Sequence, residues 1–148
     1  MRKFRALGVF ILGVCCIAWL SGCQATKQPG TFIGDMQGKN DNETAVFSVL
    51  SQLQEYVSAS EWDKWLALYS DDAILTLGEK KVSKEEMREA AQGIKKYTIT
   101  NMAVLQKVVG SDDAFVSTRL LGNGKETQES YKLKKIYGNW LIVEEMNP

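Results

Sequence analysis

Carboxylates are the side chains of this sequence that could act as general acids or bases. The 148-residue chain contains no histidine, so it has no Ser-His-Asp or Cys-His catalytic centre and no histidine-bearing zinc site. Glu129 and Glu144 are the candidates, because the strand patterns described below turn both towards an apolar face. A carboxyl group in such surroundings has a raised pKa, which suits proton transfer near neutral pH. The favoured alternative places both at an open rim, in water or beside a lysine, where neither would be catalytic.

Cys23 is the candidate for a covalent attachment. The three cysteines, Cys15, Cys16 and Cys23, lie close together near the N-terminus, so no disulfide can link parts of the chain beyond them. Residues 1–23 contain a basic patch, an apolar run over residues 6–20 and then small residues, which is the organisation of an export signal. The apolar run is short for a permanent membrane span, which needs about 20 residues.

The LSGC stretch over residues 20–23 resembles the lipobox of bacterial lipoproteins. In that family a diacylglyceryl group is joined to the cysteine sulfur and the chain is cut just before the cysteine. The resemblance implies a signal peptide over residues 1–22 and a mature chain held to the membrane by lipid on Cys23. A conventional signal peptide and an uncleaved N-terminal anchor are the alternatives. Gln24 stands where an aspartate favours retention at the inner membrane, so the outer membrane, facing the periplasm, is the expected location.

The remaining chain divides into a tether and one domain. Residues 23–41 carry the expected lipid and a polar, Gly-containing segment that predicts a flexible tether, and residues 42–148 form the domain. A first helix is predicted by apolar residues at helical spacing, and a second begins after Ser60 and includes Tyr69. Ser83 and Glu86 match a capping box, which predicts a third helix over residues 84–94. The stripe of the first helix comprises Val46, Val49, Leu50, Leu53 and Val57.

Antiparallel strands follow, over residues 97–109, 113–122, 126–137 and 140–146, and predict an α+β fold. A hairpin turn at Asn123-Gly124 places Thr118 opposite Glu129 and Val116 opposite Tyr131 on a mostly apolar face, which we expect to be concave. The same counting across a turn at residues 138–139 places Glu144 opposite Leu133, on that face too.

Aromatic side chains are candidates to line a ligand pocket in the domain. Their spacing also fits a packed core, and this alternative stays open. The predicted pocket residues are Trp65, Tyr69, Thr118, Glu129, Tyr131 and Trp140.

Residues 42–148 resemble the SnoaL-like, ketosteroid-isomerase-like domains of the nuclear transport factor two superfamily. The resemblance rests on the YSDDA run over residues 69–73 and the closing YGNWLIVEE over residues 137–145. It implies a cone-shaped, strongly bent antiparallel sheet wrapped around three N-terminal helices, with a pocket at the wide end. The general-base aspartate of the ketosteroid-isomerase branch corresponds to Leu77 here, and a leucine cannot accept a proton.

Charge and composition limit the partners. Asp71-Asp72, expected where the second helix ends, makes a poor metal site alone, and we predict no metal or cofactor. Removing residues 1–22 leaves a formal charge of −3 without a basic stripe, so nucleic acid is not an expected partner.

The sequence favours a membrane-anchored lipoprotein of the cell envelope with a non-catalytic domain that binds a small apolar ligand or an envelope protein, and that could form a homodimer through the sheet. The alternative is a small isomerase or hydrolase with a pocket carboxylate as base.

Overall fold

The computed structural model describes residues 31–33, 38–94 and 96–146. Cys23 and the predicted signal peptide lie outside these ranges. No helix among the described residues is long and apolar enough to cross a membrane. The elements are β1 (Thr31–Ile33), α1 (Asp41–Ala59), α2 (Trp62–Ala67), β2 (Tyr69–Leu77), β3 (Lys80–Ser83), α3 (Lys84–Ala91), β4 (Ile99–Val109), β5 (Asp113–Gly122), β6 (Lys125–Ile136) and β7 (Asn139–Met146).

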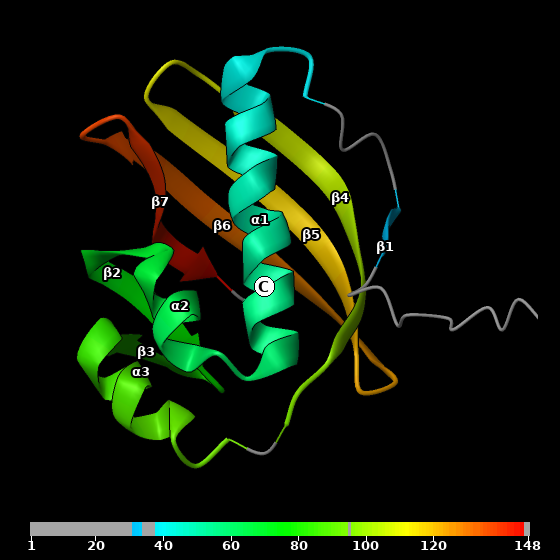
Figure 1. Cartoon of the computed structure of the whole chain (residues 1–148), viewed down its shortest axis with the longest axis vertical. Helices are drawn as coiled ribbons and strands as arrows, with labels where there is room; N and C mark the ends of the chain where they lie inside the picture. Colours follow the sequence, from blue (N-terminus) through cyan, green and yellow to red (C-terminus); the bar gives the residue numbers. More distant parts are fainter. Residues whose placement is uncertain (1–30, 34–37, 95, 147–148) are drawn as a thin grey trace, which may run out of the picture.

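One bent, open sheet contains all the strands, in the order β1-β4-β5-β6-β7-β2-β3. Helix α1 lies across its concave face, and α2 and α3 lie beside β2 and β3 (Figure 1). Register shifts in the β4–β5 and β6–β7 pairs mark bulges, which increase the twist and bend of a sheet. This arrangement confirms the predicted α+β cone. The sheet is not purely antiparallel, however, because β2 pairs in parallel with β7 and β1 with β4.

Helix α1 covers the core as its apolar spacing predicts. Its buried residues include the whole predicted stripe, together with Phe47 and Gln54. The Asn40 side chain accepts a hydrogen bond from the backbone N–H of Glu43 at 2.9 Å and so caps the first turn. At the other end Ser60 adopts a left-handed conformation with φ of 60°, which ends the helix.

The elements differ from the sequence-based prediction in several places. Tyr69 begins β2 instead of ending the second helix, so Asp71 and Asp72 also lie within this strand. Helix α3 ends at Ala91. Thr31–Ile33, within the predicted tether, pairs with β4 along the sheet edge. Local spacing did not separate helix from strand at Tyr69, because a single buried aromatic residue satisfies either pattern.

The predicted register of the β5–β6 hairpin is confirmed, whereas that of the β6–β7 hairpin is wrong. Gly122 pairs with Lys125 and Thr118 with Glu129, which confirms the count across Asn123-Gly124. The β6–β7 turn lies at Tyr137-Gly138, where both residues have positive φ, 50° and 84°, as a type I′ turn requires. Leu133 therefore pairs with Ile142.

The start of α3 offers a direct test of local stability. The Ser83 hydroxyl accepts the backbone N–H of Glu86 at 3.2 Å, and the Glu86 carboxylate accepts the backbone N–H of Ser83 at 2.7 Å. We expect Ser83→Ala to lower the free energy of unfolding by about 1 kcal/mol in urea titrations, because this cap is lost. Ser83→Thr, which keeps the hydroxyl, is the control. Equal stability of Ser83→Ala and the wild type would contradict the role given to the cap.

Candidate functional site

A cavity lies between the helices and the concave face of the sheet. Its volume is about 120 Å³. The lining residues come from α1, α2, the segment before β4, and strands β2, β4, β5, β6 and β7: Leu53, Val57, Trp65, Tyr69, Tyr97, Ile99, Leu120, Glu129, Tyr131 and Glu145. The walls are thus aliphatic and aromatic, with two carboxyl groups as their acidic members.

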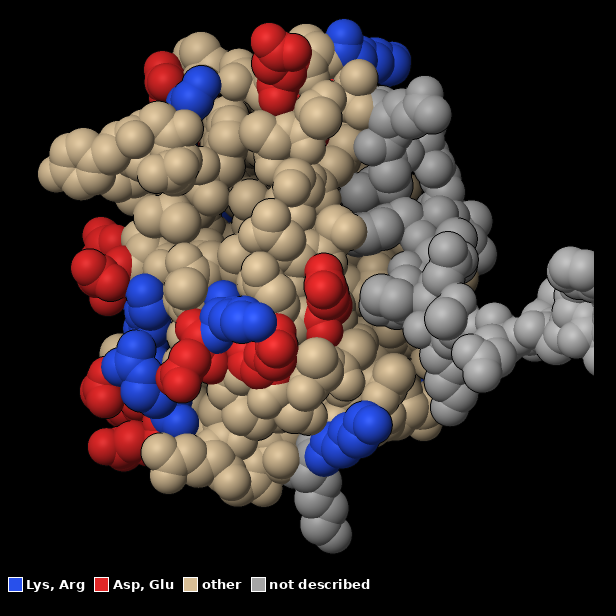
Figure 2. Space-filling model, viewed as in Figure 1, with Lys and Arg blue, Asp and Glu red and all other residues tan. Residues whose placement is uncertain are grey.

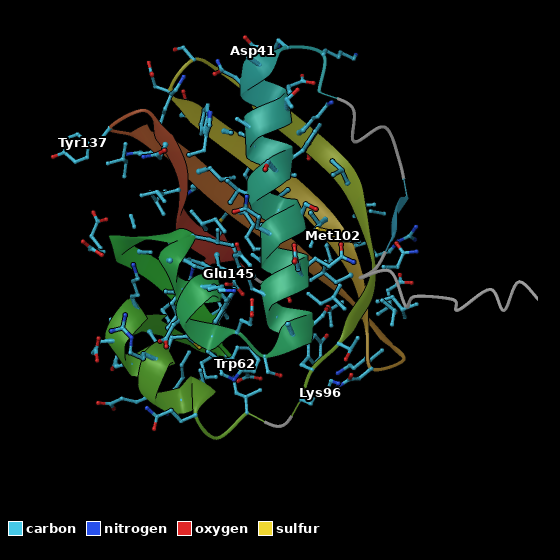
Figure 3. The ribbon with its side chains drawn as sticks, viewed as in Figure 1. Asp41, Trp62, Lys96, Met102, Tyr137 and Glu145 are labelled. Atoms are coloured by element: carbon cyan, nitrogen blue, oxygen red, sulfur yellow. The ribbon has the colours of Figure 1, made fainter. Side chains whose placement is uncertain are left out.

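Each carboxyl group in the cavity is held by a tyrosine. The Tyr131 hydroxyl donates to Glu129 Oε2 at 2.6 Å, and the Tyr69 hydroxyl donates to Glu145 Oε2 at 2.9 Å. Within the described ranges neither Oε1 atom has a hydrogen-bond partner. Figure 3 labels Glu145 on β7, where it lies near α2 in that view. The site therefore has two carboxyl oxygens free to meet a ligand.

Burial decides the protonation state of the pair. Burial and, second, the charge of Glu129 raise the pKa of Glu145 to about 8, against the opposing effects of the Tyr69 hydrogen bond and Lys81. Burial also raises the pKa of Glu129, against the Tyr131 hydrogen bond. The pKa values of both tyrosines lie well above 10, chiefly because of burial, so their hydroxyls remain donors. Near neutral pH Glu145 is a neutral acid inside a low-dielectric cavity.

Glu145, and not the predicted Glu144, faces the cavity. A bulge at Val143 adds a residue to β7, so Glu144 pairs with Lys132 and Glu145 with Tyr131. The Glu144 carboxylate lies on the outer face, 2.7 Å from Lys132 Nζ and 3.2 Å from Lys81 Nζ. These lysines lower its pKa. The predicted placement of Glu144 on the concave face is therefore wrong, because an extra residue reverses the facing of every residue after it.

The other predicted pocket residues divide into two groups. Trp65, Tyr69, Glu129 and Tyr131 line the cavity. Thr118 and Trp140 do not line it, contrary to the prediction, although both are buried, with 0% and 6% of their surface exposed. The Thr118 hydroxyl donates to the Glu129 backbone carbonyl at 3.2 Å.

Tyr97 is a cavity residue that the sequence did not reveal. It precedes β4 and lies over Gly122, where an added Cβ would overlap its hydroxyl. Glycine at this position thus permits the aromatic ring to pack against the end of the β5–β6 hairpin. The approach of this ring follows from tertiary packing, and no local pattern around Tyr97 signals it.

Three residues that the sequence analysis considered do not line the cavity: Asp71, Asp72 and Leu77, which corresponds to the general base of the ketosteroid-isomerase branch. Leu77 ends β2 with 41% of its surface exposed. Asp71 pairs with Lys84, and Asp72 accepts a hydrogen bond from Ser70 at 2.8 Å. In the part of the chain that the structure describes, no group of three or more acidic, cysteine or histidine residues could hold a metal ion. Figure 2 shows acidic and basic side chains interspersed on the face that it views.

No protein-family model and no curated protein match the sequence. Solved structures do match it. A ketosteroid isomerase-like protein from Erwinia carotovora atroseptica has a TM-score of 0.59 and 23% identity, over 72% of this chain and 94% of that one. A domain of unknown function with a cystatin-like fold from Nostoc punctiforme has a TM-score of 0.64 and 15% identity, over 74% and 78% of the two chains.

An NTF2-like protein with a cystatin-like fold from Novosphingobium aromaticivorans has a TM-score of 0.61 and 9% identity, over 72% of this chain and 80% of that one. The structural similarity to these proteins shows the fold alone, because the identities lie below 25% and one fold can carry many functions. The described domain of the chain therefore has the cone-shaped NTF2-like fold, which is also called cystatin-like.

Proposed function

We propose that the chain is a lipoprotein of the cell envelope whose domain binds a small ligand in the cone. The observation that supports ligand binding most strongly is the cavity of about 120 Å³, which its own side chains leave unfilled. A void of similar size, about 150 Å³, accepts benzene in an engineered protein. Drug-sized ligands need roughly 300 Å³ or more, so the proposed ligand has only a few non-hydrogen atoms.

The location rests on residues 1–23. The basic patch, the short apolar run and the LSGC stretch support an export signal that ends in a lipidated Cys23. Gln24 supports delivery to the outer membrane. A stable anchor needs more than one acyl chain, and the proposed modification provides two or more.

A cavity-filling variant tests the ligand-binding proposal. We expect compounds of up to about eight non-hydrogen atoms to include some that raise the thermal midpoint of the full chain. The same compounds should leave Val57→Phe unaffected, because a benzyl group would occupy the cavity that Val57 lines. Equal shifts in both proteins would place binding elsewhere, and no shift with any compound at millimolar concentration would also contradict the proposal.

A second candidate function is general-base catalysis by Glu145. It is favoured by the pKa of about 8, which allows this carboxyl group to exchange a proton near neutral pH. If a bound compound is also converted, Glu145→Gln should abolish turnover and retain binding. Turnover by Glu145→Gln at the wild-type rate would contradict this candidate.

A further inference from the structure

The cavity combines aromatic rings with acidic groups and contains no basic side chain among its lining residues. Trp65, Tyr69, Tyr97 and Tyr131 contribute the rings, and the first two pack edge to face with centroids 5.6 Å apart. Aromatic rings attract organic cations through the negative potential of their faces, and such cages recognise alkylated ammonium groups. The two carboxyl groups add acceptors for the same charge.

We propose that the cavity binds a small alkylammonium compound that also carries an oxygen atom, of the amino-alcohol type. This inference rests on the proposed function of ligand binding and names the chemical class of the ligand. Three features support it: the aromatic walls, the two carboxyl oxygens that have no hydrogen-bond partner in the described ranges, and the indole N–H of Trp65.

Among the described residues, no lysine or arginine lines the cavity beside the two carboxyl groups. The charge of Lys81 lowers the pKa of Glu145, but its Nζ contacts Glu144 Oε1 and the backbone carbonyl of Glu145, each at 3.2 Å. The titratable groups that face the pair are Tyr69 from β2, Tyr131 from β6 and Tyr97 from the segment before β4. The lining residues of α1 and α2 are uncharged. A bound cation would supply the missing charge and displace the proton held by Glu145.

Trp65 indicates the second polar group of the ligand. Only 8% of its surface is exposed, and its buried Nε1–H makes no hydrogen bond of good geometry among the described residues, although it lies close enough to the Tyr69 hydroxyl to lower the pKa of that group. A buried donor without a partner costs about 1–3 kcal/mol. An oxygen on the ligand could accept this hydrogen bond while the ammonium group meets the carboxyl groups.

The cavity volume limits the ligand to about the size of benzene. 2-(Dimethylamino)ethanol has as many non-hydrogen atoms as benzene, is a cation at neutral pH and carries one hydroxyl group. Two molecules of the same shape serve as controls: 3-methylbutan-1-ol lacks the charge, and N,N-dimethylpropan-1-amine lacks the oxygen.

Isothermal titration calorimetry of the full chain with these three compounds tests the inference. We expect 2-(dimethylamino)ethanol to bind at least about tenfold more tightly than 3-methylbutan-1-ol, and N,N-dimethylpropan-1-amine to bind with intermediate affinity. Titrations at pH 7.5 in buffers of different ionisation enthalpy should show proton release with the amines and none with the alcohol.

Matched variants locate the binding. The double variant Glu129→Gln and Glu145→Gln should lose at least about tenfold in affinity for both amines and keep its affinity for the alcohol. Glu144→Gln, one residue away on the outer face, should behave like the wild type. Equal losses in Glu144→Gln and the double variant would place the amine on the surface and overturn the inference.

The outcomes separate this inference from the proposed function. Binding of the alcohol as tightly as the amines would overturn the cation preference and leave the ligand-binding proposal standing. If no amine binds although another compound stabilises the wild type and not Val57→Phe, the inference fails alone. If no compound distinguishes the wild type from Val57→Phe, both fail.

Discussion

Raising the pH from 5 to 8 is expected to lower the free energy of unfolding of the full chain by about 1–3 kcal/mol. The cause is Glu145, whose pKa is about 8 in the folded chain and about 4.5 when exposed. Since the folded state binds this proton more tightly, the stabilisation is complete below pH 4.5 and is lost as the pH rises towards 8. One pKa unit corresponds to about 1.4 kcal/mol, and structural relaxation reduces the effect below the full difference.

The amino-acid composition simplifies the interpretation of this pH dependence. The chain has no histidine, so no other type of side chain titrates at its ordinary pKa between 5 and 8. The raised pKa of Glu129 acts in the same direction as that of Glu145. The lowered pKa values of Glu43 and Glu86 affect stability only in more acidic solution.

Urea unfolding between pH 5 and 8 compares the wild type with two single variants. Glu145→Gln should remove most of the pH dependence, because a glutamine of the same shape cannot titrate. Glu144→Gln should keep it, because that carboxylate lies on the outer face beside Lys81 and Lys132. A wild-type stability that does not change between pH 5 and 8 would show that the pair is not buried as described.

Replacing Cys23 by serine is expected to change where the protein is located in the cell. The hydroxyl of serine cannot form the thioether that joins a diacylglyceryl group to cysteine. We therefore expect Cys23→Ser to lose its acyl chains and to move from the membrane fraction to the soluble fraction after processing, or to remain as an uncleaved precursor. Each buried methylene contributes about 0.8 kcal/mol to anchoring, so loss of the chains removes the greater part of the membrane affinity.

Cell fractionation and mass spectrometry of the mature N-terminus measure this effect. The expected wild-type N-terminus is an acylated Cys23. Cys16→Ser is the matched control, because Cys16 lies within the segment that the proposed cleavage removes, and it should fractionate like the wild type. A wild-type N-terminus without acyl chains, or membrane retention of mature Cys23→Ser, would contradict the proposed anchor.

Sequence patterns predicted the parts of the site that local rules fix. The Asn123-Gly124 turn determines the β5–β6 register, and this register alone places Glu129 and Tyr131 on the concave face. Helical spacing in the same way places Leu53 and Val57 of α1 over the cavity.

The remaining parts depend on interactions that sequence spacing does not encode. With the turn at Tyr137-Gly138, a β6–β7 ladder without a bulge would still have turned Glu144 towards the cavity. The bulge at Val143 shifts the register by one residue, so that Glu145 faces the cavity in place of Glu144. The parallel pairing of β2 with β7 brings Tyr69 to Glu145, 76 positions away in the chain. Packing of Tyr97 over Gly122 likewise joins residues that are distant in sequence.

The cavity holds the carboxyl groups of Glu129 and Glu145, each with one oxygen that has no hydrogen-bond partner in the described ranges. NMR titration of the glutamate side-chain carboxyl carbons in the full chain measures the pKa of each group, with Glu145→Gln to assign the signal. We predict that the Glu145 carboxyl titrates with a pKa of about 8 and that 2-(dimethylamino)ethanol lowers this pKa. A Glu145 pKa near 4.5 would contradict the buried, unpaired site.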